Sequence, residues 1–208
     1  MTALEHALVG GFLVCAVGGT KRYGWQLAAA AGVAAVLPDW DGLTLAGGVA
    51  LFDQAHRVWG HGLLSCLAAA VLWALLDFRF DLVTRITARL LRITRVEIPP
   101  ALTAPRTASG KAACGVWILA CMTAALTHPF IDMIVSGAAG LTDWAVPIFW
   151  PFSQHGFVYP LIPWGDVGVL LIFTGAIFAM LRWRHRTERI ALYALIAAGL
   201  YALVRGMF

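Results

Sequence analysis

Six apolar runs, separated by short polar or proline- and glycine-rich segments, constrain the fold of this chain most strongly. They cover residues 7–19, 25–37, 62–76, 112–134, 167–181 and 190–204. Hydrophobic residues make up 61% and charged residues 12% of the 208 residues, whereas soluble domains are about 25% charged. The sequence therefore predicts an all-α, polytopic membrane helix bundle with six crossings, forming one domain over residues 1–208.

The apolar runs differ in length, and the segments between them differ in composition. The first two runs hold about 13 residues, fewer than the roughly 20 of a perpendicular crossing, so they must cross a thinned bilayer or pass inside the bundle. Residues 43–52 are apolar but short, which favours a re-entrant or interfacial piece. Residues 77–95 repeat apolar side chains every four positions beside arginines, which predicts an amphipathic surface helix. Residues 136–165 are rich in Pro, Gly and Trp and predict a structured loop.

The basic residues predict the orientation. Of the 15 Lys and Arg, two lie at 21–22, seven within 77–111 and four within 182–189. With the N-terminus outside, six crossings place all three segments in the cytoplasm, as the positive-inside rule requires. No basic n-region or cleavage site marks a signal peptide, so we expect the first helix to be retained. The basic balance thus reflects membrane topology, and a nucleic-acid partner is not expected.

Cysteines do not predict a metal or redox motif here. Cys15, Cys66, Cys114 and Cys121 all lie inside apolar runs, and none belongs to a C-x-x-C pair. We interpret them as small buried apolar residues.

The segment T-H-P-F-I-D at residues 127–132 ends the fourth apolar run. On a helix, His128 and Asp132 are four residues apart and share a face, where an imidazole and a carboxylate can bind one Zn²⁺-like ion. The alternative is a hydrogen-bonded pair that orients the helix end. The predicted topology favours the metal, because it places most of the chain's histidines and three aspartates on the same outer side. These residues are His6, His56, His61, His128, His155, Asp39, Asp41 and Asp132.

Two further segments carry most of this polar set. In L-P-D-W-D-G at 37–42, Pro38 ends the second run and two carboxylates follow; the alternative to a cation site is a solvated turn. In H-R-V-W-G-H at 56–61, His56 is expected in a cap or loop and His61 in the first helical turn, with a pair of interfacial histidines as the alternative. Arg57 suits a phosphate or other oxyanion, unless it extends to lipid headgroups.

Several motifs, in this order, resemble the family of LexA-regulated, membrane-bound metal-dependent hydrolases. They are His6 with Gly10, L-P-D-W-D at 37–41, H-R-x-x-x-H at 56–61, T-H-P-F-I-D at 127–132 and V-P-I-F-W-P-F-S at 146–153. The resemblance implies that seven residues bind metal: His6, Asp39, Asp41, His56, His61, His128 and Asp132. The order of ligands is also similar to zinc-dependent phospholipase C and P1-type nucleases. A later H-x-x-x-E or H-x-x-x-D is missing, so we expect two ions, with His155 assisting.

These observations predict a metal-dependent hydrolase of the inner (cytoplasmic) membrane that cleaves a phosphoester of a lipid or lipid-linked substrate at the outer face. Zinc, or alternatively manganese, would activate water. Whichever of Asp39 and Asp41 is not a ligand would act as general base, with Asp41 the favoured catalytic residue, and Arg57 and His155 would contact the substrate. Two alternatives are a divalent-cation transporter, whose site would lie nearer the midplane, and a non-catalytic membrane protein with a structural metal.

Overall fold

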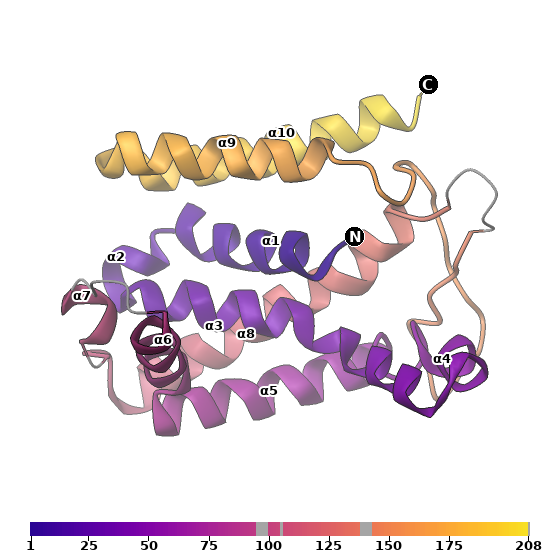
Figure 1. Cartoon of the computed structure of the whole chain (residues 1–208), viewed down its shortest axis with the longest axis horizontal. Coiled ribbons are helices and arrows are strands. Elements are labelled where there is room, and N and C mark those ends of the chain that lie inside the picture. The colour runs from indigo at the N-terminus through magenta and orange to yellow at the C-terminus, as the bar shows by residue number, and fades with distance from the viewer. Residues whose placement is uncertain (95–99, 105, 138–142, 208) are drawn as a thin grey trace.

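Helices form every regular element in the parts of the chain that the computed structural model describes, residues 1–94, 100–104, 106–137 and 143–207 (Figure 1). The α-helices are α1 (Ala3–Ala16), α2 (Gly19–Tyr23), α3 (Trp25–Val36), α4 (Val49–Ala55), α5 (Leu63–Phe80), α6 (Leu82–Ile93), α7 (Pro100–Thr103), α8 (Gly110–Ile134), α9 (Gly168–Arg182) and α10 (Thr187–Arg205). Two 3₁₀ segments, η1 (Leu37–Gly47) and η2 (Arg184–Arg186), join them. The all-α prediction is confirmed.

Three of these helical segments are long and apolar enough to cross a membrane: Leu63–Phe80, Gly110–Ile134 and Arg184–Arg205. α1 and α9 are apolar but shorter, with 14 and 15 residues. α3 has only 12 residues, as the length of its apolar run predicts. The six predicted apolar runs thus all form helices, and six crossings stay a prediction.

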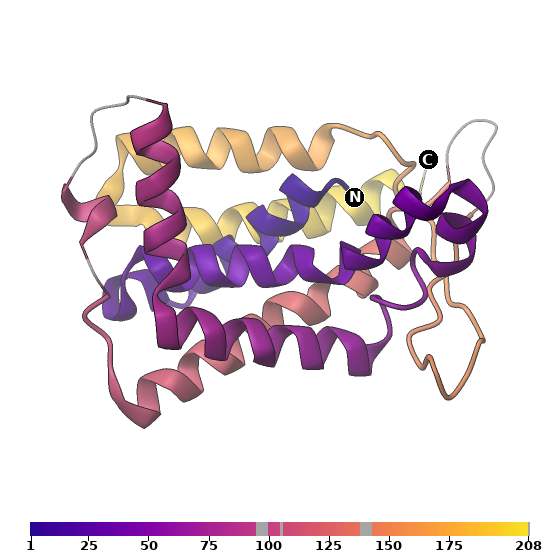
Figure 2. The ribbon, with the colours of Figure 1, turned by 60° about the horizontal axis from the view of Figure 1, so that its bottom comes forward.

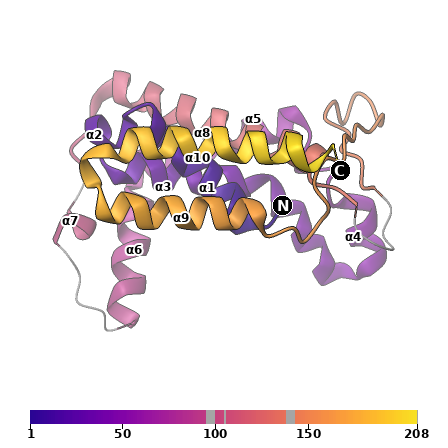
Figure 3. The same cartoon turned by 90° about the horizontal axis from the view of Figure 1, so that it is seen from above.

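The main helices pack in layers along a common direction. The hairpin of α9 and α10 covers α1, α1 lies on α3, and α8 crosses between α3 and α5 (Figures 1 and 3). Gly10 permits the close contact of α1 with α3, because a Cβ there would lie 2.6 Å from the carbonyl oxygen of Ala31. Small side chains let membrane helices approach in this way. Alanines of α3, α5 and α8 surround the fully buried Trp117 and complete this part of the core.

The prediction of buried cysteines is confirmed for two of the four, whereas Cys15 and Cys114 are only partly buried. Cys66 and Cys121 are fully buried among the alanines of α3, α5 and α8. All four cysteines are free thiols.

The predicted amphipathic helix at 77–95 is wrong at its N-terminal end. α5 continues through Phe80, and the chain turns at Asp81, whose φ of 51° lies in the left-handed region. The buried Asp77 carboxylate accepts the Val83 N–H at 2.8 Å and the Trp117 indole N–H at 2.8 Å, so it caps the start of α6 and ties it to α8. α6 then leaves the bundle at a steep angle (Figure 2). Arg95 lies outside the described residues.

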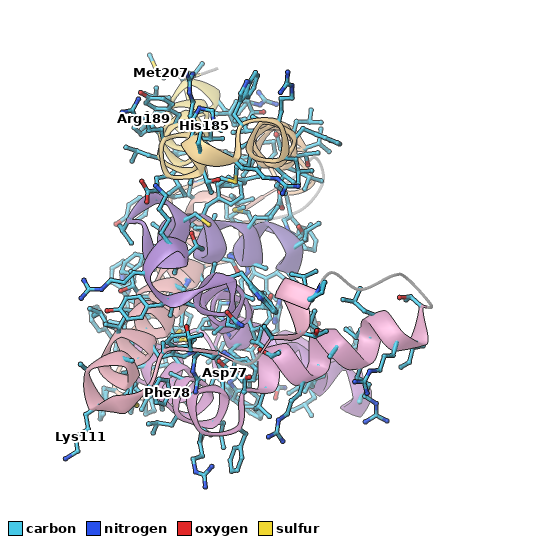
Figure 4. All side chains as sticks on the ribbon, turned by 90° about the vertical axis from the view of Figure 1, so that its left-hand side faces the viewer. Asp77, Phe78, Lys111, His185, Arg189 and Met207 are labelled. Carbon is cyan, nitrogen blue, oxygen red and sulfur yellow. The ribbon has the colours of Figure 1, made fainter. Side chains whose placement is uncertain are left out.

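The two ends of the bundle differ in charge. α2, α6 and the turn between α9 and α10 lie at one end (Figure 1). Figure 4 looks onto this end and shows Lys111, His185 and Arg189 on three different segments. Segment 43–52 and the described part of the loop after α8 lie at the opposite end, where the bridges among the described residues are Val135–Ile162 and Val146–Phe157. The charge pattern predicts this separation, and the orientation of the two ends in the membrane stays a prediction.

Candidate metal centre

Four segments bring the predicted ligands to one end of the bundle. α1 begins there, α3 ends there in η1, α5 begins there, and α8 ends there. Because neighbouring helices alternate in direction, residues far apart in sequence become neighbours. The convergence predicted from topology is therefore confirmed for most of the set, and the details differ from residue to residue.

One side-chain atom from each of four residues meets at the centre of the site: Asp39, His61, His128 and Asp132. The two imidazole Nε2 atoms of His61 and His128 are 3.2 Å apart. Asp132 Oδ2 lies 3.4 Å from the first and 3.6 Å from the second. Asp39 Oδ1 lies 3.7 Å from His61 Nε2 and 3.4 Å from His128 Nε2. All but Asp39 are buried.

The second nitrogen of each imidazole is already engaged. His128 Nδ1 lies 2.6 Å from the carbonyl oxygen of Ala35, which can only accept, so this nitrogen donates. His61 Nδ1 lies 3.0 Å from Asp41 Oδ2 and donates to the carboxylate. Such bonds fix the tautomer and turn the Nε2 lone pair toward a metal position. Two lone pairs and two carboxylate oxygens then converge, and this arrangement requires a positive charge.

In the absence of a metal ion, the hydrogen bonds of His61 to two carboxylates favour its protonated form, which supplies this positive charge. Burial by itself lowers the pKa of this imidazole, but its hydrogen bonds to Asp132 and Asp41 raise the pKa from 6.5 to about 9. A carboxylate favours the protonated form of a neighbouring imidazole. An ion that binds here must displace this proton.

The donor set fits a tetrahedral divalent ion. Zinc bonds of about 2.0–2.2 Å to nitrogen and oxygen give a tetrahedron whose edges are about 3.3–3.6 Å. Five of the six edges among the four atoms measure 3.2, 3.4, 3.4, 3.6 and 3.7 Å. Two imidazole nitrogens with two carboxylate oxygens are ligands that suit zinc, and manganese is compatible with the oxygens.

A second group of possible ligands adjoins the first and shares one residue with it. It consists of Asp39, Asp41 and His56. His56 is the cap residue after α4, as expected, and its Nδ1 lies 2.9 Å from Asp41 Oδ1. Three protein ligands leave a position of a tetrahedral ion free, which is typical of catalytic zinc sites.

Asp41 is poorly suited to the predicted role of general base. It is fully buried and accepts hydrogen bonds from His56 Nδ1, His61 Nδ1 and the Gly60 N–H, the last at 2.8 Å. Burial raises its pKa, but the bonds from His56 and His61 lower it to about 2. A base is most effective when its pKa lies near the working pH. The geometry therefore favours Asp41 as a residue that orients the two imidazoles.

His6 lies beside the four-atom centre and outside both groups of possible ligands. Its ring stacks on that of His128, with centroids 3.6 Å apart, and its Nε2 lies 3.1 Å from Asp132 Oδ1. The amino nitrogen of Met1 lies 2.9 Å from the same oxygen. His6 Nδ1 is buried and has no hydrogen-bond partner among the described residues. His6 thus contacts Asp132, and its role as a metal ligand stays a prediction.

Arg57 is buried beside Asp132 and does not extend to a lipid surface. Only 4% of the residue is exposed, and its φ of 63° is unusual for a side chain of this size. Nη1 donates to the carbonyl oxygens of Asp132 at 3.2 Å and Trp144 at 3.0 Å, and Nε lies 3.5 Å from Asp132 Oδ2. The alternative of a headgroup-seeking surface arginine is therefore wrong.

His155 has no contact with the centre in the described part of the chain. It is exposed, and its ring packs against that of Phe157 with centroids 4.8 Å apart. Two groups that position the site were not among the predicted residues. The first is the backbone carbonyl of Ala35, which no amino-acid type in the sequence could have indicated. The second is Gly60, and here the residue type is informative: a Cβ at this position would overlap the Pro38 carbonyl oxygen, so only glycine fits.

Comparison with known proteins supports the membrane assignment. A family model described as YdjM inner membrane protein matches residues 1–208. No curated protein and no solved structure matches the chain. The family description mentions neither hydrolysis nor a metal, so the resemblance to hydrolases and to phospholipase C stays a prediction. Because the family model covers the whole chain, the protein belongs to the YdjM inner membrane protein family.

Proposed function

We propose that this protein is a metal-dependent hydrolase that cleaves a phosphoester of a lipid or lipid-linked substrate. One observation carries the proposal: four acceptor atoms from three parts of the chain meet at the spacing of a zinc tetrahedron, with both imidazole tautomers already fixed. A proton on His61 can hold these atoms together in the absence of an ion, and the same four atoms would hold a divalent ion once that proton is displaced. The proposed complement is two ions, the first in this centre and the second at Asp39, Asp41 and His56.

A divalent ion supplies Lewis acidity, which lowers the pKa of water toward about 7 and neutralises charge on an attacked phosphate. The residues of the chain orient the ligands and bind the substrate. Asp41 orients the imidazoles, and His6 holds Asp132 through its second oxygen. Arg57 is the cation next to the centre, and a guanidinium matches the oxygens of a phosphate. Asp132 already pairs with this cation, and the Arg57 Nε–H that lacks a hydrogen-bond partner among the described residues favours a further anionic group, that of the substrate.

The surroundings favour a lipid. The centre lies at the end of a bundle whose outer surface exposes many large apolar side chains, among them Leu119, Leu171 and Phe178. Segment 43–52 exposes Leu43 and Val49 at the same end. By the positive-inside rule the opposite, basic end faces the cytoplasm, so the proposed site faces the extracytoplasmic side, where membrane phospholipids are within reach.

A structural metal is the second candidate, and one feature favours it. The four-atom centre has four protein ligands, and structural zinc sites are closed and four-coordinate in this way. The three-ligand group at Asp39, Asp41 and His56 points to catalysis instead, because it leaves a position free. The number of bound ions and the presence of activity separate the two candidates.

The test uses the full chain purified in detergent, loaded with zinc or manganese. We expect about two ions per chain by elemental analysis and release of a phosphorylated headgroup from phospholipid micelles. His128→Ala should remove the tightly bound ion and the activity, while Cys114→Ala on the same helix should change neither. Wild-type metal content in His128→Ala refutes the centre. Full metal content without hydrolysis of any phospholipid favours the structural metal.

A further inference from the structure

A cavity of about 350 Å³ lies directly beside the candidate metal centre. Arg57, which contacts the metal ligand Asp132, forms part of its wall, so the cavity and the centre share a residue. The other lining residues that matter here are Asp53, Ser136, Asp143, Trp144 and Trp164. A volume of this size suits a small polar ligand or the headgroup of a lipid.

The charges around this cavity have opposite signs and do not neutralise one another. Arg57 is the buried cation, and its Nε has no hydrogen-bond partner among the described residues. Asp53 and Asp143 are exposed, and neither makes an ion pair or hydrogen bond with any part of the chain that the structure describes. The cavity is therefore lined by one buried cation, which is paired with Asp132 but whose Nε–H has no hydrogen-bond partner among the described residues, and by two exposed carboxylates.

The aromatic lining adds a second feature that suits a cation. Arg57 makes a cation–π contact with the Trp144 ring, with its guanidinium carbon 5.4 Å from the ring centroid. Trp164 is 51% exposed and lines the same cavity. An ammonium group is attracted to the face of an indole, and neighbouring carboxylates strengthen the attraction.

Two further cavities share lining residues with this one or with each other, and the last of them is lined almost entirely by apolar side chains. Trp164 also lines a smaller cavity of about 90 Å³, together with Val135 and Ile162. These two residues in turn line a third cavity of about 180 Å³, which includes Phe173 of α9 and Leu195 of α10. The sequence of polar and then apolar cavities matches a ligand with a charged head and an apolar tail.

We propose that the cavity binds the zwitterionic headgroup of a phospholipid. Its phosphate would contact Arg57 next to the metal centre, and its ammonium group would lie between Asp53 and Asp143 near the Trp164 ring. The proposal rests on the proposed function for its metal centre, and it adds the substrate class: phosphate diesters that carry an ammonium group, in preference to anionic phospholipids.

Binding measurements test the headgroup without requiring turnover. The probes are glycerophosphoethanolamine and glycerophosphoglycerol, two diesters that share the phosphate and differ in the ammonium group. We expect the zinc-loaded protein to bind the first at least tenfold more tightly, measured by tryptophan fluorescence or calorimetry. Asp53→Asn/Asp143→Asn should remove this difference while zinc content stays unchanged. Asp81→Asn, the same chemical change at the opposite end of the bundle, should preserve it.

Two results would overturn the proposal: equal affinity of the wild-type protein for both probes, or a preference that survives in the double variant. Nanodiscs of phosphatidylethanolamine or phosphatidylglycerol then identify the source of the headgroup. Tenfold tighter binding of phosphatidylethanolamine than of glycerophosphoethanolamine supports binding of the acyl chains in the apolar cavities. Equal binding of the two overturns the lipid assignment in favour of a soluble phosphodiester. An ammonium preference without hydrolysis refutes the hydrolase and leaves the binding site standing.

Discussion

Replacement of Asp41 by Asn tests whether a residue behind the metal centre controls its affinity. The change keeps the size of the side chain and removes its charge. In the structure, the carboxylate accepts from His56 Nδ1 at 2.9 Å, His61 Nδ1 at 3.0 Å and Gly60 N–H at 2.8 Å. An amide has one acceptor oxygen, so its NH₂ group must face at least one of these donors.

The expected loss of zinc affinity follows from these contacts. A hydrogen bond from imidazole to a carboxylate makes the ring a more basic ligand and holds its tautomer, and removal of such a partner typically weakens metal binding about 10–100-fold. That factor corresponds to about 1.4–2.7 kcal/mol. Direct loss of a ligand of the first ion, as in His128→Ala, should cost more, so Asp41→Asn should leave a measurable and weakened first site. The second ion, of which Asp41 is a proposed ligand, should be lost.

Competition with a chromophoric zinc chelator measures this affinity in the purified chain, with Asp81→Asn as the matched control. The expected order is wild type and Asp81→Asn equal, Asp41→Asn weaker, and His128→Ala without the tight site. An Asp41→Asn protein that binds zinc as tightly as the wild type would refute the reasoning that Asp41 orients His61.

Three further changes follow from the same geometry. Arg57→Lys should keep the bound metal but lower turnover about tenfold or more, since a charge-assisted contact contributes about 1.5–3 kcal/mol; unchanged turnover on a phosphoester contradicts this. Because the pKa of His61 is raised to about 9, zinc must displace its proton at neutral pH. The Kd for zinc should therefore rise about tenfold when the pH falls from 8 to 7, and one proton should be released per ion bound. Calorimetry in two buffers of different ionisation enthalpy measures both. Gly60→Ala places a Cβ 1.9 Å from a carbonyl oxygen and should destabilise the protein by about 1–3 kcal/mol in thermal unfolding, whereas Gly175→Ala, which meets open space, should not.

Much of the architecture was predictable because hydrophobicity and helix direction leave few choices. The i, i+4 spacing of His128 and Asp132 placed them on one face, and their side-chain atoms are 3.6 Å apart. Alternating helix direction then brought Asp39 and His61 to the same end. These inferences need only helix periodicity and the topology of the chain, so they hold without atomic detail.

The remaining features depend on contacts that residue types do not encode. A backbone carbonyl, that of Ala35, fixes the tautomer of His128. The inward position of Arg57 follows from a left-handed backbone and two carbonyl acceptors, which a helix-based analysis cannot foresee. The break at Asp81 likewise arises because the Asp77 side chain captures the Val83 N–H. In each case a specific hydrogen bond, in two of the cases between residues far apart in sequence, decides between geometries that the apolar pattern allows equally.

The short lengths of α1 and α3 have a consequence for how the protein is made. At about 1.5 Å per residue, the 14 residues of α1 reach only about 21 Å, less than the roughly 30 Å of a bilayer's hydrocarbon core. Neither helix is long enough to cross the hydrocarbon core by itself, and both pack against the longer α8. Because α8 is synthesised more than 70 residues after α3 ends, insertion of the N-terminal half must wait for α8. Biogenesis of this protein should thus proceed as a late, concerted assembly, and not as the insertion of one helix after another.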